Sequence, residues 1–332
     1  MGKTILITGG CGFVGHHIVE YYLKNSDMDI IIIDKLSYSS CGFDRVVDIE
    51  AYDSKRVKIL SCDLSNTGEQ GVFKECENIN YIIHLAAESH VDRSITHPME
   101  FVMSNTVGTV NLLEFAMKLD NLELFVYFST DEVFGPAPNN VRYSEYDRYN
   151  STNPYSASKA AAEQFCNAYA NCYKLPIIVT RSMNIFGERQ HPEKFIPLCI
   201  NKILKGETIQ IHSSSDKKIS GSRFYIHARN VANAIDFIIK SYELTDGNID
   251  YFNIVGEKEV TNLNLARMIA NIMGKGLYFE MVDFHSSRPG HDLRYALDGS
   301  KMTKLGWIIP KTFEDSLEKT VKWLLERPQW LK

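Results

Sequence analysis

A tyrosine and a lysine able to do acid–base chemistry stand four residues apart, as Tyr155 and Lys159. The apolar pattern of residues 154–173 predicts a helix, and Pro154 suits its first turn. Residues four apart share one helical face. Beside a hydride acceptor, the ammonium would lower the pKa of the phenol, so that the tyrosinate takes a proton from an alcohol. A chance pair on the surface is the alternative.

Thr130, Asp131 and Glu132 follow residues 124–128, whose apolar run predicts a buried strand. The carboxyl ends of parallel strands are where open α/β sheets bind their ligands. Thr130 can hydrogen-bond the same hydroxyl that Tyr155 deprotonates. Hydride transfer needs one acid–base group, so two adjacent carboxyls favour a reaction that also removes a proton and protonates a leaving group. The alternative is that both carboxyls cap the next turn or face solvent.

Glycines at 9, 12 and 15 join a first strand, residues 4–8, to a predicted helix, residues 14–24. This spacing lets the chain turn tightly and approach a pyrophosphate, which the N–H groups of the helix start then bind. The predicted cofactor-binding residues next to these glycines and after the following strands are Phe13, Val14, Leu64, Leu85 and Ala87.

Two aspartates follow the second and third predicted strands. Asp34 stands nineteen residues after Gly15, where a carboxylate binds the adenosine ribose and repels a ribose phosphate, so NAD is expected rather than NADP. Asp63 either reaches the adenine or caps a turn through Ser65, and the sequence leaves both open.

Short apolar runs alternate with amphipathic segments through the first 180 residues. This alternation predicts an α/β fold with a doubly wound parallel sheet, of the Rossmann type, and a smaller α/β lobe. The expected domains are 1–182, with interleaved segments from about 225–255, and 183–332. The predicted strands are 4–8, 29–33, 57–60, 81–85, 124–128, 176–180 and 251–255. The predicted helices are 14–24, 98–119, 154–173, 196–205, 230–241, 262–273 and 313–326. Residues 184–187, 212–221 and 286–291 are expected to be polar loops.

Composition narrows the class of protein. The 332 residues carry 36 basic and 41 acidic side chains, so the net charge of −5 offers no general field for nucleic acid or anionic lipid. No apolar run approaches the roughly 18 residues that span a bilayer, and the first residues enter a strand without room for a signal peptide. Seven scattered cysteines without a Cys-x-x-Cys pair indicate reduced thiols. A soluble cytoplasmic protein is expected.

Four motifs resemble the nucleotide-sugar 4,6-dehydratases of the extended short-chain dehydrogenase/reductase superfamily, over residues 4 to about 325. They are the glycine loop, residues 85–92 (Leu-Ala-Ala-Glu-Ser-His-Val-Asp), residues 129–135 (Ser-Thr-Asp-Glu-Val-Phe-Gly) and Tyr155-x-x-x-Lys159. The resemblance implies that Thr130, Tyr155 and Lys159 oxidise the sugar, with Asp131 as acid and Glu132 as base. It also implies bound NAD and a 4-keto-6-deoxy product on the way to sugars such as rhamnose. A homodimer is implied too, with helices 98–119 and 154–173 forming a four-helix bundle.

Arginines of the second lobe could bind the anionic diphosphates that these reactions involve. Arg223 and Arg288 are the candidates, because guanidinium groups fit phosphate oxygens bidentately; salt bridges between the lobes are the alternative. The resemblance places both at the diphosphate of a nucleotide sugar. The other substrate-binding residues that it implies are Ser89, Asn184, Glu193, Lys194, Asn253, His291 and Tyr295.

Other activities remain open at this point. A UDP-hexose 4-epimerase or a UDP-glucuronate decarboxylase is the runner-up, although an epimerase needs no carboxyl pair beside Thr130. A non-catalytic NAD-binding regulatory subunit is a different class, which the presence of Tyr155 and Lys159 disfavours. No metal is expected, since His84, His90 and Asp92 match no zinc spacing, and His84 is expected to be a packed, hydrogen-bonded histidine. The sequence does not distinguish dTDP from UDP.

Overall fold

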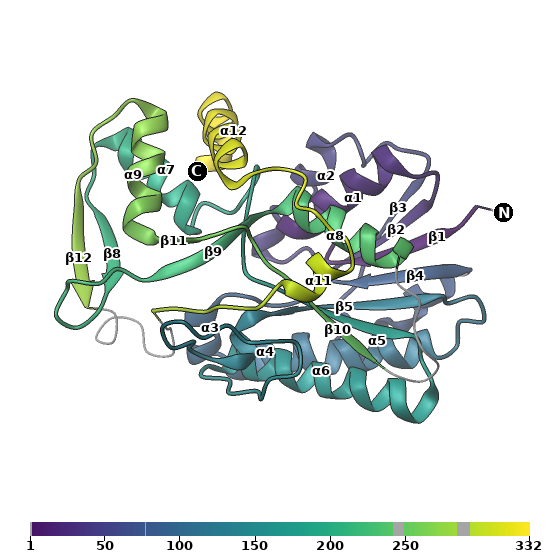
Figure 1. Ribbon diagram of the computed structural model, residues 1–332. Helices are drawn as coiled ribbons and strands as arrows, with labels where there is room; N and C mark the ends of the chain where they lie inside the picture. Colours follow the sequence, from purple (N-terminus) through teal and green to yellow (C-terminus); the bar gives the residue numbers. More distant parts are fainter. Residues whose placement is uncertain (1, 77, 242–248, 284–292) are drawn as a thin grey trace.

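The first lobe of the protein is built on one seven-stranded parallel sheet (Figure 1). A computed structural model describes residues 2–76, 78–241, 249–283 and 293–332. The strand order is β10-β6-β5-β4-β1-β2-β3, so the order reverses between β1 and β4, as in doubly wound sheets. The strands are β1 (Thr4–Thr8), β2 (Asp29–Asp34), β3 (Val57–Ser61), β4 (Ile79–His84), β5 (Leu124–Thr130), β6 (Ile177–Ser182) and β10 (Asp250–Ile254). The predicted fold class is confirmed.

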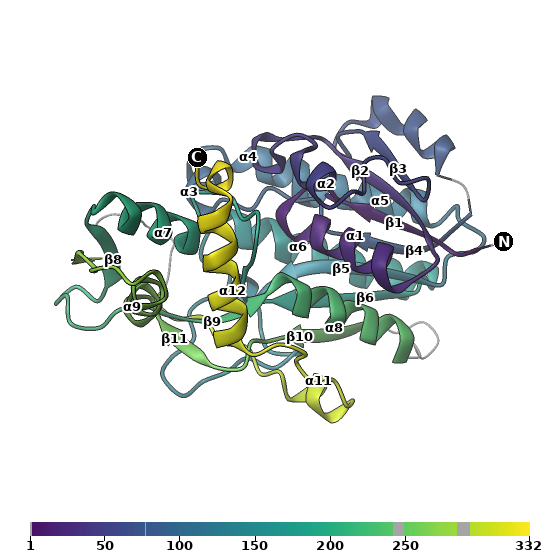
Figure 2. The same cartoon turned by 90° about the horizontal axis from the view of Figure 1, so that it is seen from above.

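Helices cover both faces of this sheet because its strands are apolar on both sides. In β1, Ile5 and Ile7 face one core while Leu6 faces the other. The first core is closed by α1 (Phe13–Asn25), α2 (Asp44–Asp48), α8 (Ala228–Ser241) and α11 (Ser300–Lys304). The second is closed by α5 (Gly108–Ala116) and α6 (Pro154–Tyr173), with α3 (Val91–Thr96) and α4 (Pro98–Phe101) nearby. Seen from above, α1 and α8 run side by side over the sheet (Figure 2).

The second lobe, at the left of Figure 1, is smaller and has a core of its own. Its strands are β7 (Asn184–Phe186), β8 (Ile209–Ser213), β9 (Ser222–His227), β11 (Glu259–Thr261) and β12 (Phe279–Asp283). They form a three-stranded sheet, β11-β9-β7, and a parallel pair, β12-β8. Its helices are α7 (Phe195–Lys205), α9 (Asn262–Met273) and α12 (Phe313–Glu326).

One sequence expectation about elements was wrong, and another needs a smaller correction. Residues 98–116 are helical throughout, as α4, a π-helical turn over Val102–Val107 and α5, so the predicted helix is interrupted in its hydrogen bonding and ends at Ala116 instead of residue 119. The turn carries Asn105, whose buried amide bonds both the N–H and the carbonyl of Glu88. Residues 184–187 are not a polar loop, because Asn184–Phe186 pairs with β9 as strand β7. Residues 286–291 lie outside the described residues.

Candidate active site

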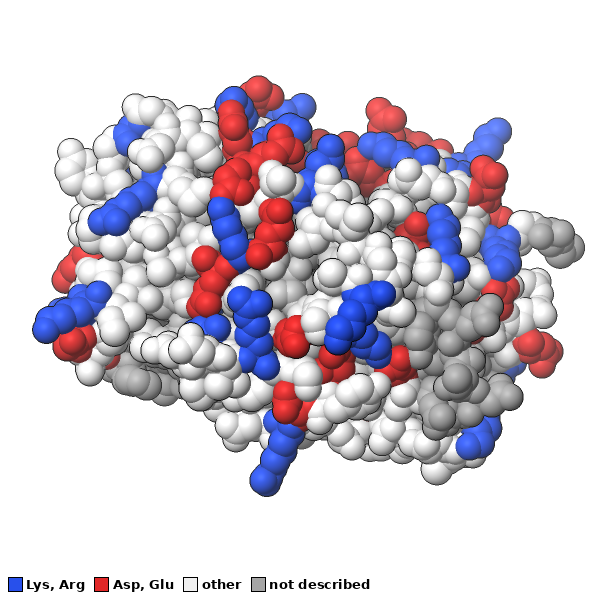
Figure 3. Space-filling model, in the orientation of Figure 1, with Lys and Arg blue, Asp and Glu red and all other residues white. Residues whose placement is uncertain are grey.

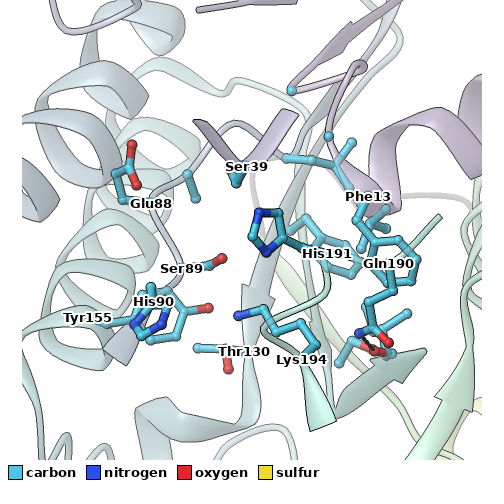
Figure 4. A pocket seen from close by; sticks show the side chains of 18 of the residues that line it. Phe13, Ser39, Glu88, Ser89, His90, Thr130, Tyr155, Gln190, His191 and Lys194 are labelled. Carbon is cyan, nitrogen blue, oxygen red and sulfur yellow. Dashed lines mark hydrogen bonds between the residues drawn. The ribbon is translucent and has the colours of Figure 1, made fainter. Parts of the chain in front are cut away.

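One cavity of about 510 Å³ lies at the carboxyl ends of the first-lobe strands and reaches into the second lobe. The glycine loop, the ends of β2, β4 and β5, the start of α6 and the segment after β7 all line it. Figure 4 shows Ser89, Thr130 and Tyr155 on one side, with His191 and Lys194 approaching from another element. The site is therefore assembled from both lobes.

The glycine loop packs so closely on neighbouring backbone that no side chain would fit at Gly9 or Gly15. A Cβ at Gly9, whose φ is +71°, would lie 2.8 Å from the backbone nitrogen of Ala86. A Cβ at Gly15 would lie 2.1 Å from the carbonyl oxygen of Gly9. Gly12 precedes α1 without any side-chain cap, so the first N–H groups of the helix remain available to a phosphate group. This geometry fits the pyrophosphate of a dinucleotide.

Asp34 is the last residue of β2 and lines the cavity. Its carboxylate accepts hydrogen bonds from the N–H groups of Cys11, at 3.0 Å, and Leu36, at 2.8 Å. Burial raises the pKa of this carboxyl, and the two hydrogen bonds oppose that shift. The neighbouring cation is engaged elsewhere, because Lys35 Nζ lies 2.8 Å from Glu88 Oε1.

The remaining predicted cofactor residues also reach the cavity. Asp63 both lines it and accepts hydrogen bonds from the N–H and the hydroxyl of Ser65, at 2.9 and 2.7 Å. The two interpretations left open for this aspartate are thus compatible. The other cavity-lining residues of this set are Gly9, Gly12, Phe13, Val14, Gly15, Leu64, Leu85 and Ala87.

The end of β5 brings the hydroxyl of Thr130 against the carboxyl of Asp131 and the backbone of Glu132. Thr130 Oγ1 accepts from the N–H of Glu132 at 3.3 Å and donates to Asp131 Oδ1 at 3.1 Å. Asp131 Oδ2 is buried and has no hydrogen-bond partner among the described residues. Burial, together with the charge of Glu132, raises the pKa of Asp131 to about 7, and Arg223 opposes the shift. Asp131 can therefore hold a proton near neutral pH.

Tyr155 and Lys159 occupy consecutive turns of α6 and both line the cavity. Lys159 Nζ donates to the carbonyl of Phe128 at 2.7 Å, and burial lowers its pKa to about 8 while Glu163 opposes the shift. Burial raises the pKa of the Tyr155 phenol, the charge of Glu132 adds to this, and a hydrogen bond with Thr130 opposes it. In the chain alone the pKa of Tyr155 is therefore raised, and not lowered as the sequence suggested for the cofactor-bound site.

Most of the residues expected to bind substrate line the same cavity. Arg223 Nη1 donates to the carbonyls of Ser222 and Leu293, each at 2.7 Å, and its guanidinium lies 4.8 Å from the ring centroid of Tyr295. The expected residues that line the cavity are Ser89, Asn184, Glu193, Lys194, Arg223 and Tyr295.

Asn253 is not among the residues that line the cavity. Its side chain is buried, and its amide donates to the carbonyls of Tyr143 and Asp298, both at 3.1 Å, so it joins the end of β10 to neighbouring loops. Arg288 and His291 lie outside the described residues.

Other cavity residues were not predicted from the sequence. His191 and Gln190 follow β7, and Arg45 of α2 lies fully buried against the glycine loop, where its guanidinium donates to the carbonyls of Cys11 and Ser39. Asn153 does not line the cavity but contacts Glu132, which does, and the sequence marked it as an Asn directly before Pro154. Arg45 gives no such signal, because nothing local marks it as buried.

His84 is a packed, hydrogen-bonded histidine, as expected. His84 is buried, and its ring nitrogens lie 2.6 Å from Thr8 Oγ1 and 2.9 Å from Thr109 Oγ1. Burial lowers its pKa to about 3. Among the described residues, no three His, Cys, Asp or Glu side chains gather as a metal site would require. Of the described helices, none is both long and apolar enough to cross a membrane.

Comparisons with known proteins agree with this geometry. The chain is 36% identical to a dTDP-glucose 4,6-dehydratase of Salmonella typhimurium, over 98% of this chain and 94% of the relative. It is 34% identical to a trifunctional UDP-glucose 4,6-dehydratase/3,5-epimerase/reductase of Arabidopsis thaliana, over 99% of this chain and 48% of that protein. A crystal structure of dTDP-glucose 4,6-dehydratase from Streptomyces venezuelae, with NAD bound, superposes with a TM-score of 0.87 at 31% identity, covering 99% of both chains.

A family model described as GDP-mannose 4,6 dehydratase matches residues 6–320. Because this match spans nearly the whole chain, and the relatives exceed 30% identity over almost all of it, the chain belongs to the GDP-mannose 4,6 dehydratase family.

Proposed function

We propose that this chain is an NAD-dependent hydro-lyase that converts a nucleoside-diphosphate glucose to its 4-keto-6-deoxy form. The observation that carries the proposal is the pair of adjacent carboxyls, Asp131 and Glu132, in one cavity with Thr130, Tyr155 and Lys159. Asp131 has a pKa of about 7, so it can donate a proton at neutral pH. A reaction with one proton to remove and one hydroxyl to expel uses both carboxyls.

The cofactor would lie along the glycine loop, with its ribose at Asp34. The close approach of backbone at Gly9 and Gly15 and the uncapped start of α1 fit a pyrophosphate. When bound, the nicotinamide accepts a hydride from the sugar and later returns it. Since the elimination lies between these two transfers, net consumption of NAD is not expected, which favours tight binding.

The side chains then divide the proton transfers. Tyr155 accepts the proton of the hydroxyl at carbon 4, and Thr130 hydrogen-bonds the same oxygen. The ketone at carbon 4 acidifies carbon 5, from which Glu132 removes a proton. Glu132, after exchange with solvent, returns a proton to carbon 5 when the hydride is returned to carbon 6. Asp131 protonates the hydroxyl that leaves carbon 6. Lys159 lies one turn beyond Tyr155 and donates a hydrogen bond to the carbonyl of Phe128. When it is protonated, its positive charge favours the tyrosinate form of Tyr155.

The diphosphate would be bound by cations of the second lobe. Arg223 and Lys194 both line the cavity, and Tyr295 is positioned for stacking beside Arg223. The relatives act on dTDP-glucose and on UDP-glucose, so both nucleotides are candidates.

The assembly that we propose is a homodimer through the α4–α6 side of the first lobe. Large apolar side chains are exposed there, with exposed fractions of 64% at Met99, 41% at Met103 and 42% at Phe165. A second copy would bury them and complete a four-helix bundle. The seven cysteines are not in disulfides, which suits a reducing compartment, so we also propose the cytoplasm. Acidic and basic side chains are interspersed over the face in Figure 3, without a single-sign patch for nucleic acid among the described residues drawn there.

Isotope transfer tests the reaction. Glucose deuterated at carbon 4, as its dTDP or UDP derivative, should give product that lacks one water and carries that deuterium at carbon 6. In heavy water, solvent deuterium should enter at carbon 5. Return of the label to carbon 4 would indicate an epimerase, and label on released cofactor a net dehydrogenase. Loss of carbon dioxide from UDP-glucuronate, supplied as a separate substrate, would indicate a decarboxylase. No turnover of any sugar nucleotide by protein that binds NAD would favour a regulatory subunit.

Two variants separate the half-reactions. Tyr155→Phe should abolish oxidation, so neither the absorbance of reduced nicotinamide nor product appears. Glu132→Gln should permit oxidation and stop before elimination, so that absorbance accumulates on the enzyme. Elimination at the normal rate by Glu132→Gln would show that another group is the base.

A further inference from the structure

Asn153 contacts the two elements that carry the acid–base residues. Its side-chain oxygen accepts a hydrogen bond from the N–H of Ser156 at 2.8 Å, which caps the start of α6 two residues before Tyr155. Its side-chain nitrogen donates to Glu132 Oε2 at 3.0 Å. The residue is buried, with 6% of its surface exposed. A single amide thus joins the helix of Tyr155 to the turn of Glu132.

The capping bond fixes which way the amide faces. The N–H of Ser156 can only donate, so the oxygen of Asn153 must face it and the NH₂ group must face Glu132. An NH₂ group donates and does not accept, so the form of Glu132 that suits this contact is the carboxylate. Ser156 completes the arrangement, since its hydroxyl pairs with the backbone of Asn153.

This contact distinguishes two carboxyls that are adjacent in the chain. Asp131 has a buried oxygen without a partner among the described residues, whereas Glu132 receives a donor that cannot accept a proton. A reaction that needs an acid beside a base requires such a difference. A base also needs a fixed direction, because a displacement of about 1 Å can cost roughly a hundredfold in rate.

We propose that Asn153 is the positioning residue for the base Glu132, in addition to being the N-cap of α6. This inference rests on the proposed function, because it assigns Asn153 to the elimination half of that reaction. It predicts that the two roles of Asn153 can be separated by substitution, since Ser and Asp cap helices as well as Asn does.

Three variants separate the roles. Asn153→Ser retains a cap and removes the donor, Asn153→Asp retains a cap and places a carboxylate beside Glu132, and Asn153→Ala removes both cap and donor. Thr312→Ser, at the cap of α12 outside the cavity, is the matched control. Each protein is loaded with NAD and the sugar nucleotide that the wild type dehydrates. Oxidation is followed by nicotinamide absorbance, elimination by entry of solvent deuterium at carbon 5, and folding by the thermal midpoint.

Asn153→Ser should oxidise the sugar at close to the wild-type rate, but it should exchange the hydrogen at carbon 5 roughly 10- to 100-fold more slowly. Its thermal midpoint should be unchanged. Asn153→Ala should show the same exchange defect with a lower midpoint. Thr312→Ser should match the wild type in every measurement. Exchange by Asn153→Ser at the wild-type rate, or equal loss of oxidation and exchange, would overturn the proposal.

The Asn153→Asp variant tests the pH dependence of carbon 5 exchange, which would not change if Asn153 were only a helix cap. Asp131 of the same turn and Tyr155 of α6 also face Glu132, and a further carboxylate there disfavours its ionised form. The rise of carbon 5 exchange with pH should therefore shift to higher pH, and an unshifted profile would contradict the proposal. If wild-type protein neither dehydrates nor exchanges any sugar nucleotide, the proposed function itself fails, which differs from a defect confined to the variants.

Discussion

Asp131 is the residue whose environment most constrains the chemistry. Its raised pKa of about 7 arises mainly from burial, so the carboxyl is protonated below neutral pH and ionised above it. In the proposed reaction the acid form of Asp131 protonates the leaving hydroxyl, so dehydration should fall about tenfold per unit above about pH 7. Towards lower pH the rate should fall as well, because Glu132 must be ionised to act as the base. The pH dependence of single-turnover elimination measures this.

The matching variant is Asp131→Asn, which preserves shape and cannot donate a proton. Elimination should fall sharply while oxidation at carbon 4 continues. A wild-type rate that remains level well above neutral pH would show that Asp131 is not the acid.

The preference for NAD over NADP is also expected to depend on a single residue, Asp34. Asp34 receives two backbone N–H groups at the end of β2, and Lys35 is paired with Glu88 at 2.8 Å, so the proposed ribose site presents a carboxylate next to a neutralised cation. Asp34→Ala should weaken NAD binding and reduce discrimination against NADP.

Calorimetric titration with both dinucleotides is the measurement, and Asp29→Ala, at the exposed start of the same strand, is the control. Equal affinities of Asp34→Ala and wild type for each dinucleotide would place the ribose elsewhere.

Many of the candidate site residues could be predicted from their spacing along the chain, whereas the positions of others depend on tertiary contacts. The distance from Tyr155 to Lys159 is a property of one helix, and Asp34 follows from strand length, so both are readable along the chain. Asn253 was expected in the pocket, but its amide pairs with the carbonyls of Tyr143 and Asp298, which are distant in sequence. Such partners leave no local pattern.

Among the elements, α6 and strands β5 and β6 are joined by a buried ion pair. Arg181 Nη2 lies 2.6 Å from Glu163 Oε2, with side-chain exposures of 1% and 0%, and Ser129 Oγ also donates to Glu163. Glu163→Gln leaves the guanidinium uncompensated and should lower the free energy of unfolding by about 3–5 kcal/mol.

Chemical denaturation measures that loss. Glu318→Gln removes an exposed pair with Lys322 on α12 and should change stability by less than about 0.5 kcal/mol. Similar values for the two variants would show that the buried pair adds little.

The elements themselves were predictable to different degrees. Buried strands such as β1 are apolar on both faces, and α6 begins at a proline and carries an apolar pattern, so both are visible in the sequence. The π-helical turn Val102–Val107 is not, because Asn105 must bond Glu88 and Ser158 from another part of the chain. Strand β7 is three residues long and exists through its pairing with β9, which no local period can reveal.

For the whole molecule, the proposed dimer gives a test that does not depend on activity. A charge at Met99 or Phe165 would be desolvated in the interface, so Met99→Glu with Phe165→Glu should shift the protein from dimer to monomer. Sedimentation velocity reports the mass. Ile308→Glu, on an apolar side chain that is 82% exposed near α11, is the control and should leave the mass unchanged. A wild-type monomer would contradict the proposed assembly.

The position of β10 has a consequence for biosynthesis. Strand β6 ends at Ser182, but its outer neighbour in the sheet is β10, which starts only at Asp250. While the ribosome is still making the intervening segment, the nascent first lobe exposes the backbone of Ile177–Ser182 as an open edge, the kind of edge on which chains aggregate. A fragment that stops near Ser182 would keep this edge of β6 permanently, so the first lobe should not be obtained as a well-behaved fragment. Translation must pass residue 254 before β10 can cover β6.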